Sequence, residues 1–100
     1  MINVSVLGYG TVGSGVVEVL HTNSESIAKK VGDTLNVKHI LDLRDFPGDP
    51  FEEKIVHDFD EIVKDDEVEI VVETMGGVKP AYDFVKACLE AGKNVCTSNK

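Results

Sequence analysis

Three glycines near the start of the sequence have a spacing that suits phosphate binding. Gly8, Gly10 and Gly13 form the pattern G-x-G-x-x-G directly after an apolar run that ends at Leu7. In such a pattern the first glycine allows a tight turn, the second lets a diphosphate approach the backbone, and the third lets a helix pack closely. The candidate cofactor-binding residues of this turn are Gly8, Tyr9, Gly10, Thr11, Val12 and Gly13.

The free N–H groups at the start of the following helix, together with the helix dipole, favour an anion. The position of the glycines between a predicted strand and a predicted helix therefore indicates dinucleotide binding. The alternative is an ordinary strand-to-helix turn whose glycines serve packing alone.

A second group of candidates follows the second predicted strand. Asp42 there favours NAD, because a carboxylate accepts hydrogen bonds from an unmodified ribose, whereas Arg44 favours the 2′-phosphate of NADP. The sequence leaves NAD and NADP open as the cofactor. The interval from Gly13 to Asp42 exceeds the usual spacing of about 20 residues, which a long first helix explains. The alternative for Arg44 and Asp45 is that both are solvated loop charges.

Hydrophobic periodicity places these candidates in an alternating pattern of strands and helices. We expect strands at the start of the chain and over residues 35–43, 55–56, 68–72 and 94–97, and a long helix over 11–31 with a kink or break at 21–24. The apolar stripe expected on that helix comprises Val12, Val16, Val19, Leu20, Ile27 and Val31. Alternation predicts an α/β fold of the Rossmann type, a parallel sheet of order 3-2-1-4-5 with helices on both faces.

Composition narrows the possible partners. The chain has 100 residues, 42% of them hydrophobic, a formal net charge of −8 and a pI near 4.7, which argues against nucleic-acid and membrane-surface partners. Any phosphate site must therefore be local. Cys88 and Cys96 lack metal-ligand spacing, so we expect reduced core residues, no metal site and a cytoplasmic protein.

Four segments carry a family resemblance. GYGTVGSGVVEVL, LRD, ETMGGVKPA and TSNK, in this order, resemble the nucleotide-binding domain of homoserine dehydrogenases, and the match runs through nearly all 100 residues. The resemblance implies NAD(P)-dependent interconversion of aspartate 4-semialdehyde and homoserine, a step towards threonine and methionine. It matches residues 8–13 to the pyrophosphate loop and Arg44 to a basic position near the adenosine 2′-phosphate.

The resemblance also implies roles at the nicotinamide end. Thr74, Gly76 and Gly77 match the loop beside the nicotinamide ribose, and Lys100 matches a lysine that contacts the cofactor or acts in acid–base chemistry. Lys100 is therefore the catalytic candidate as well as a cofactor-binding one. Hydride attack on an aldehyde builds negative charge on its oxygen, which an ammonium group stabilises or protonates. The alternative for Lys100 is a solvated lysine.

Length is the departure from the family pattern. Homoserine dehydrogenases are several times longer and carry a substrate and dimerisation domain after this one, so we expect residues 1–100 to be the NAD(P)-binding domain of a homo-oligomeric parent, inactive alone. Two other functions stay open. One is another nicotinamide oxidoreductase, such as a relative of glucose-fructose oxidoreductase, which usually shows EKP where this sequence has TSNK. The other is a non-catalytic dinucleotide-sensing module.

Overall fold

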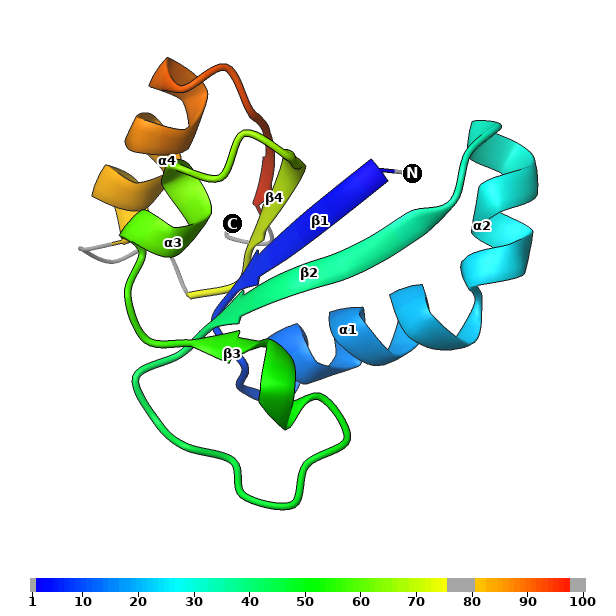
Figure 1. Cartoon of the computed structure of the whole chain (residues 1–100), viewed down its shortest axis with the longest axis horizontal. Helices are drawn as coiled ribbons and strands as arrows, with labels where there is room; N and C mark the ends of the chain where they lie inside the picture. The colour runs from blue at the N-terminus through cyan, green and yellow to red at the C-terminus, as the bar shows by residue number, and fades with distance from the viewer. Residues whose placement is uncertain (1, 76–80, 98–100) are drawn as a thin grey trace.

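A parallel β-sheet organises the chain. The structure, a computed structural model, describes residues 2–75 and 81–97. Its five strands have the order β3-β2-β1-β4-β5 and all pair in parallel (Figure 1), which confirms the predicted class and strand order. The strands are β1 Ile2–Leu7, β2 Leu35–Leu41, β3 Ile55–Val56, β4 Val68–Glu73 and β5 Asn94–Thr97.

Helices cover both faces of the sheet. The helices are α1 Thr11–Thr22, α2 Ser24–Val31, a 3-10 turn η1 Glu52–Lys54, α3 Asp60–Val63 and α4 Ala81–Glu90. Figure 1 shows α1 and α2 on one side of the strands and α3 and α4 on the other. The long helix expected over residues 11–31 is indeed broken: Asn23 ends α1 and donates its backbone N–H to Val19 O at 2.9 Å.

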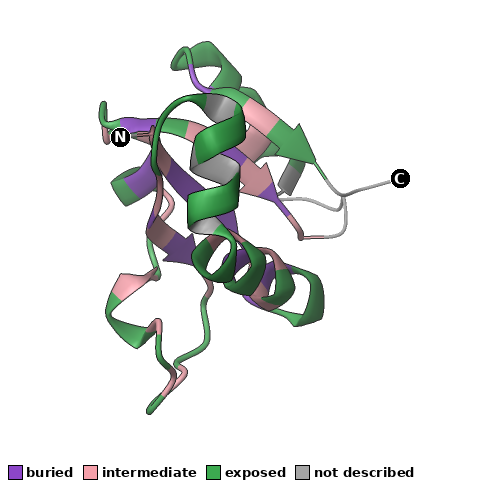
Figure 2. Ribbon diagram, turned by 90° about the vertical axis from the view of Figure 1, so that its right-hand side faces the viewer, coloured by how far each residue is buried: buried purple, intermediate pink, exposed green. Residues whose placement is uncertain are grey.

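The core consists of two clusters, one on each face of the sheet. Because successive side chains of a strand point to opposite faces, Leu7 packs with α3 and α4, whereas its neighbour Val6 packs with α1. Leu41 and Ile40 divide in the same way. Figure 2 shows the central strands buried and the outer sides of the helices exposed. Burial on both faces explains why the strands read as nearly continuous apolar runs.

Three details differ from the sequence expectation. The second strand ends at Leu41 rather than at residue 43, and Leu43 is 85% exposed. On α1, Val12 and Val19 are 54% and 52% exposed and Val17 is fully buried, because the close approach of the helix at Gly13 turns the i+4 position towards the sheet.

The third difference concerns the cysteines. Both are free thiols; Cys88 is buried in the core as expected, but Cys96 is exposed. Cys96 lies on β5, the outer strand of the described sheet, and its neighbour Val95 takes the side that packs against the core. The expectation of two core cysteines is therefore wrong for Cys96.

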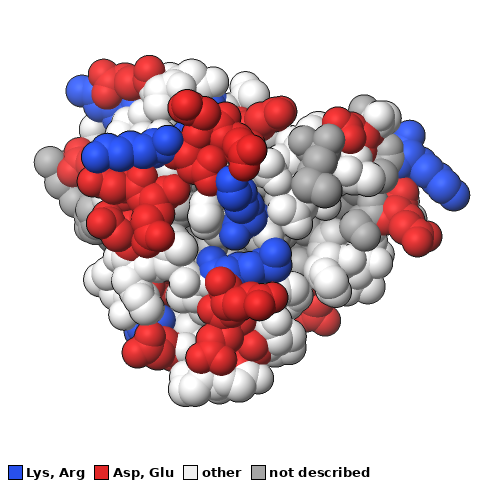
Figure 3. Space-filling model, in the orientation of Figure 1, with Lys and Arg blue, Asp and Glu red and all other residues white. Residues whose placement is uncertain are grey.

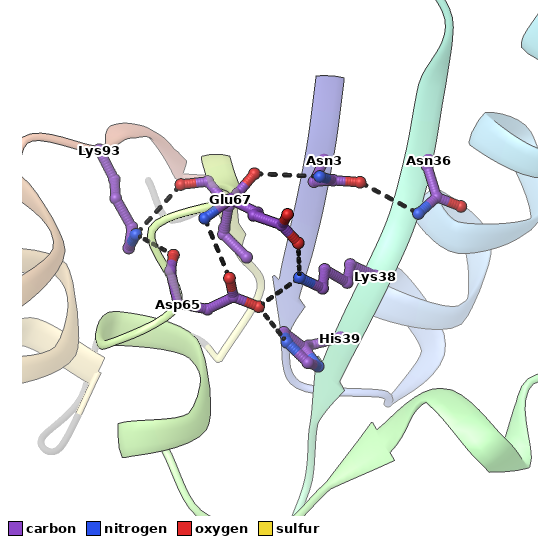
Figure 4. Close-up of polar contacts among 8 residues, drawn as sticks. Asn3, Asn36, Lys38, His39, Asp65, Glu67 and Lys93 are labelled. Carbon is purple, nitrogen blue, oxygen red and sulfur yellow. Dashed lines mark hydrogen bonds and ion pairs between the residues drawn. The ribbon is translucent and has the colours of Figure 1, made fainter. Parts of the chain in front are cut away.

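A network of polar side chains, which we call the polar clasp, joins the middle of β2 to the segments that lead into β4 and β5 (Figure 4). It consists of Lys38, His39, Asp65, Glu67 and Lys93. The Asp65 carboxylate contacts Lys38 Nζ at 2.7 Å and His39 Nε2 at 2.9 Å, and Lys38 also contacts Glu67 at 2.7 Å. The hydrogen bond from Lys38 holds the pKa of the Asp65 carboxyl well below its usual range.

Lys93 is the buried member of the polar clasp. Its residue is only 7% exposed, and its ammonium donates to Asp65 O at 2.7 Å and to Val68 O at 3.1 Å. It thereby satisfies two carbonyl oxygens of the segment that leads into β4. Burying those oxygens without a donor would cost stability.

We expect Lys93→Met to lower the free energy of unfolding by about 1–3 kcal/mol, because it keeps the apolar stem but removes the ammonium's hydrogen bonds to both carbonyls, and Asp65 O keeps only the bond from Val68 N at 3.1 Å. Urea denaturation measures the loss. Lys64→Met is the matched control: the Lys64 side chain is 78% exposed, with one ion pair of 3.6 Å to Asp60, so a change within about 0.5 kcal/mol is expected. An equal loss in both variants would contradict this role of Lys93.

Candidate functional site

Two of the three motif glycines are required by the protein's own packing. Gly8 has a φ of +103°, and its N–H extends the sheet by donating to Leu41 O at 2.7 Å. A Cβ placed on Gly13 would lie 1.8 Å from Gly8 O, a distance that no atom pair of this kind tolerates. The turn is thus tight because α1 begins almost in contact with the end of β1.

Gly10 differs from the other two. Its φ is −86°, which any residue adopts, and a Cβ placed there would meet only Arg44 Nη2 at 4.0 Å. Neither backbone strain nor packing within the described residues explains a glycine here. The remaining explanation is the open space beside the start of α1, because a larger side chain at residue 10 would obstruct a ligand there.

The amides around Gly10 differ in whether the protein's own hydrogen bonds occupy them. Gly10 accepts the first bond of α1 from Ser14 N at 2.8 Å, and within residues 2–75 and 81–97 no hydrogen bond engages the amides of Thr11 and Val12. By contrast, Tyr9 N donates to Asp42 Oδ2 at 3.0 Å and so is occupied by the protein itself. The predicted pyrophosphate loop therefore offers the amides at the start of α1 rather than all six of residues 8–13.

A cleft of about 520 Å³ opens beside this turn, at the carboxyl ends of β1, β2 and β4. Its size falls within the usual range for small-molecule sites. The cleft brings together Gly8, Gly10, Asp42, Arg44 and Thr74 from the predicted set. It is lined by Gly8, Gly10, Leu41, Asp42, Leu43, Arg44, His57, Phe59, Thr74, Met75 and Phe84.

Several of these lining residues were missed by the sequence analysis. His57 and Phe59 lie between β3 and α3, Met75 follows β4 and Phe84 lies on α4, so no local spacing connects these three segments. Phe59 and Phe84 stack with ring centroids 4.1 Å apart, which forms an aromatic wall. His57 lies at the rim, with Nε2 at 3.1 Å from Asp45 Oδ1, and both side chains are more than half exposed.

Asp42 holds Arg44 rather than presenting free oxygens. Asp42 Oδ1 accepts from the backbone N and Nε of Arg44 at 2.9 and 3.0 Å, and Oδ2 accepts from Arg44 Nη2 at 2.9 Å. Since Oδ2 also accepts from Tyr9 N, both carboxylate oxygens are engaged twice. Arg44, the only arginine in the sequence, remains 64% exposed at the cleft. The hydrogen bonds from Arg44 lower the pKa of Asp42 to about 2.

This low pKa predicts a specific acid sensitivity. Because the folded-state pKa of Asp42 is about 2, below the ordinary value of 3.8, its contribution to stability is complete above about pH 4 and is lost as the pH falls through 2. We expect Asp42→Asn to lower the free energy of unfolding by about 1 kcal/mol at neutral pH, with a difference from wild type that shrinks between about pH 4 and pH 2. Chemical denaturation across that range measures the difference. A gap independent of pH would contradict the assignment.

Thr74 joins the end of β4 to the glycine turn. Its hydroxyl donates to Leu7 O at 2.9 Å and to Gly8 O at 3.0 Å, and its backbone N–H donates to Leu7 O at 3.0 Å. The predicted site residue is thus present in the cleft, where it fixes the turn. Beside it, the buried Glu73 accepts from Thr97 Oγ1 at 2.6 Å and from Met75 N.

Glu73 was not a predicted site residue. The signal that marks it is a carboxylate directly after the apolar run of residues 70–72 in β4, because a buried carboxylate there is costly unless it is hydrogen-bonded. Three predicted site residues, Gly76, Gly77 and Lys100, lie outside the described residues. The described cleft therefore contains the part of the predicted cofactor site that the glycine turn and the end of β2 form.

The charge of the surface is consistent with an anion site confined to the cleft rather than spread over the surface. On the face shown in Figure 3, acidic side chains cover more of the surface than basic ones do. Within the part of the chain that the structure describes, no group of three or more His, Cys, Asp or Glu side chains is placed to hold a metal ion. No described helix has the length and hydrophobicity needed to cross a bilayer.

The parallel sheet, the glycine turn after β1 and the cleft at the strand ends define a dinucleotide-binding domain of the Rossmann type. Comparison with known proteins narrows this class. A family model described as the NAD-binding domain of homoserine dehydrogenase matches residues 8–100. The chain therefore belongs to the family of homoserine dehydrogenase NAD-binding domains, and its cofactor is NAD or NADP.

Solved structures and curated sequences agree with this family. A crystal structure of S. aureus homoserine dehydrogenase has a TM-score of 0.88 and 36% identity, covering 99% of this chain and 26% of that one. The enzyme of Thiobacillus denitrificans gives 0.85 and 34%, covering 98% and 23%. Homoserine dehydrogenase of Mycobacterium tuberculosis is 38% identical over 99% of this chain and 23% of its own length. The chain thus spans about a quarter of the length of these relatives.

Proposed function

We propose that this chain is the cofactor-binding part of an enzyme that interconverts L-aspartate 4-semialdehyde and L-homoserine with NAD(P)H, towards threonine and methionine. The family match supports the substrates, and Gly10 carries the cofactor-binding part, because neither the fold nor the packing of the described residues requires a glycine there. The open side of Gly10, next to the amides of Thr11 and Val12, fits the diphosphate of a dinucleotide.

Arg44 is proposed to contact the 2′-phosphate of NADP. Asp42 has both oxygens engaged by Arg44 and Tyr9, so it is poorly placed to accept hydrogen bonds from the ribose of NAD. Arg44, in contrast, is fixed on one side and exposed on the other. This arrangement favours the arginine over the carboxylate as the group that reads the adenosine ribose.

The nicotinamide end is assigned from the family resemblance. Thr74, Gly76 and Gly77 are proposed to lie beside the nicotinamide ribose, and Lys100 is proposed to act near the reacting carbonyl. The bound cofactor supplies a hydride to the aldehyde carbon. Lys100 would stabilise the negative charge that develops on the aldehyde oxygen, or protonate that oxygen, as the carbon–hydrogen bond forms.

We further propose that residues 1–100 form the NAD(P) domain of a cytoplasmic homo-oligomer whose substrate-binding residues lie elsewhere. The chain's share of its relatives' length, about a quarter, supports this division. Residues 1–100 are then expected to bind cofactor without oxidising homoserine.

Two measurements test the function. Calorimetric titration of NAD and NADP into residues 1–100 should show saturable binding, and the protein expressed from the whole reading frame should reduce NAD(P) when homoserine is added. Nucleotide binding without homoserine oxidation by the whole reading-frame product would favour a dinucleotide-sensing module instead. Oxidation of a different alcohol would favour another nicotinamide oxidoreductase.

A further inference from the structure

Tyr9, between the first two motif glycines, makes contacts that the glycine motif does not require. Its residue is only 7% exposed, and its hydroxyl donates to Asp49 Oδ1 at 2.8 Å. Its ring meets the Phe46 ring edge to face, with centroids 4.9 Å apart and planes at 89°. A residue of the phosphate turn is thereby attached to the loop of residues 42–51 that follows β2.

The same loop carries Arg44. The guanidinium of Arg44 lies over the Phe46 ring, with Cζ 5.2 Å from the ring centroid, and its other support is the Asp42 carboxylate. Tyr9 contacts both supports, since its ring packs on Phe46 and its N–H donates to Asp42 Oδ2. Two short paths of contact therefore lead from Tyr9 to Arg44.

Asp49 is the loop residue that accepts the hydrogen bond from the hydroxyl of Tyr9. Asp49 Oδ1 also accepts from Phe51 N at 2.8 Å, so one carboxylate oxygen fixes both the loop and the turn. Burial, and next the hydrogen bond to Asp49, raise the pKa of Tyr9 to about 12, so the hydroxyl remains a donor at neutral pH. By contrast, Leu43 and Arg44 themselves are exposed, whereas Phe46 and Phe51 at either side of Asp49 pack against the core, so the contacts of Tyr9 join a partly anchored loop to the turn.

We propose that Tyr9 is a positioning residue that sets how strongly Arg44 distinguishes NADP from NAD. The inference rests on the proposed contact between Arg44 and the 2′-phosphate. A ligand held by its diphosphate at the start of α1 reaches Arg44 productively only if the loop keeps a fixed place relative to the turn. Tyr9 provides that link, and NAD, which lacks the 2′-phosphate, does not need it.

Tyr9→Phe tests the link because it removes only the hydroxyl and keeps the ring against Phe46. We expect the Kd for NADP to rise about three- to fivefold and the Kd for NAD to change by less than about 1.5-fold, measured by calorimetry at one ionic strength. The sequence offers a matched control in its only other tyrosine. Tyr82 is 63% exposed on α4 and does not line the cleft, so Tyr82→Phe should change neither Kd.

A double-mutant cycle locates the effect. In an Asp49→Ala background, Tyr9→Phe should leave the ratio of the two Kd values unchanged, because the acceptor is already gone. In the otherwise wild-type protein, a Tyr9→Phe substitution that left the ratio of the two Kd values unchanged, whether or not both rose, would overturn the inference. A change in that ratio that persisted in the Asp49→Ala background would also overturn it. Wild-type protein that binds neither nucleotide would instead refute the proposed function, and the inference with it.

Discussion

Gly13→Ala is expected to lower the free energy of unfolding by about 3 kcal/mol or more and to abolish measurable dinucleotide binding. The new methyl group would lie 1.8 Å from Gly8 O and 2.9 Å from Thr74 Oγ1, so the start of α1 must move away from the end of β1. That movement displaces the amides of Thr11 and Val12 from their place next to Gly10, which lines the cleft. Urea denaturation and calorimetric titration of NADP measure the two effects.

Gly15→Ala is the matched control on the same helix. A Cβ at Gly15 meets no heavy atom within 4 Å, and alanine is the better helix former, so stability should rise by about 0.5–1 kcal/mol with unchanged binding. If Gly13→Ala proved as harmless as Gly15→Ala, the contact between the start of α1 and the glycine turn would be wrong.

Arg44→Ala should weaken NADP binding about 10- to 100-fold while changing NAD binding by less than about twofold. A guanidinium paired with a phosphate makes charge-assisted hydrogen bonds, and only NADP carries the 2′-phosphate. The substitution also releases Asp42, which leaves an unpaired carboxylate at the cleft and adds repulsion towards the same phosphate. Parallel calorimetric titrations at fixed ionic strength measure both constants.

Two further variants separate geometry from charge. Arg44→Lys keeps the positive charge but loses the fork that grips Asp42, so its NADP affinity should fall between wild type and Arg44→Ala. Lys64→Ala removes one exposed positive charge from a residue that does not line the cleft, and should change neither constant. Equal losses of NAD and NADP in Arg44→Ala would remove Arg44 from the 2′-phosphate site.

The strand order and most element bounds could be predicted because the signals are local. Apolar runs, glycine stops and alternation each act over a few residues, and together they led to the order that the structure confirms. These local signals did not predict which face of α1 is exposed. Val12 and Val19 fit a helical stripe as well as Val17 does, and only the close approach at Gly13 decides which side meets the sheet.

The cleft was predictable only in part, for a related reason. Glycine spacing located the turn and strand position located Asp42 and Arg44, but the sequence left their roles open between two cofactors. The roles depend on hydrogen bonds between residues more than 30 positions apart, such as Tyr9 to Asp42 and Tyr9 to Asp49. Likewise, Phe59 and Phe84 meet only because α3 and α4 share one face of the sheet.

The location of the polar clasp has a consequence for engineering this domain. Asp65 and the Lys93 ammonium bound to it lie at the start of β4, a strand of six residues, so about 20 Å separates them from the cleft at the end of that strand, whereas Lys38 and His39 lie within β2 and closer to the cleft residue Leu41. Substitutions that far apart act additively as a rule. Heat tolerance and nucleotide preference can therefore be altered in separate rounds of mutagenesis, with gains in one carried over intact to the other.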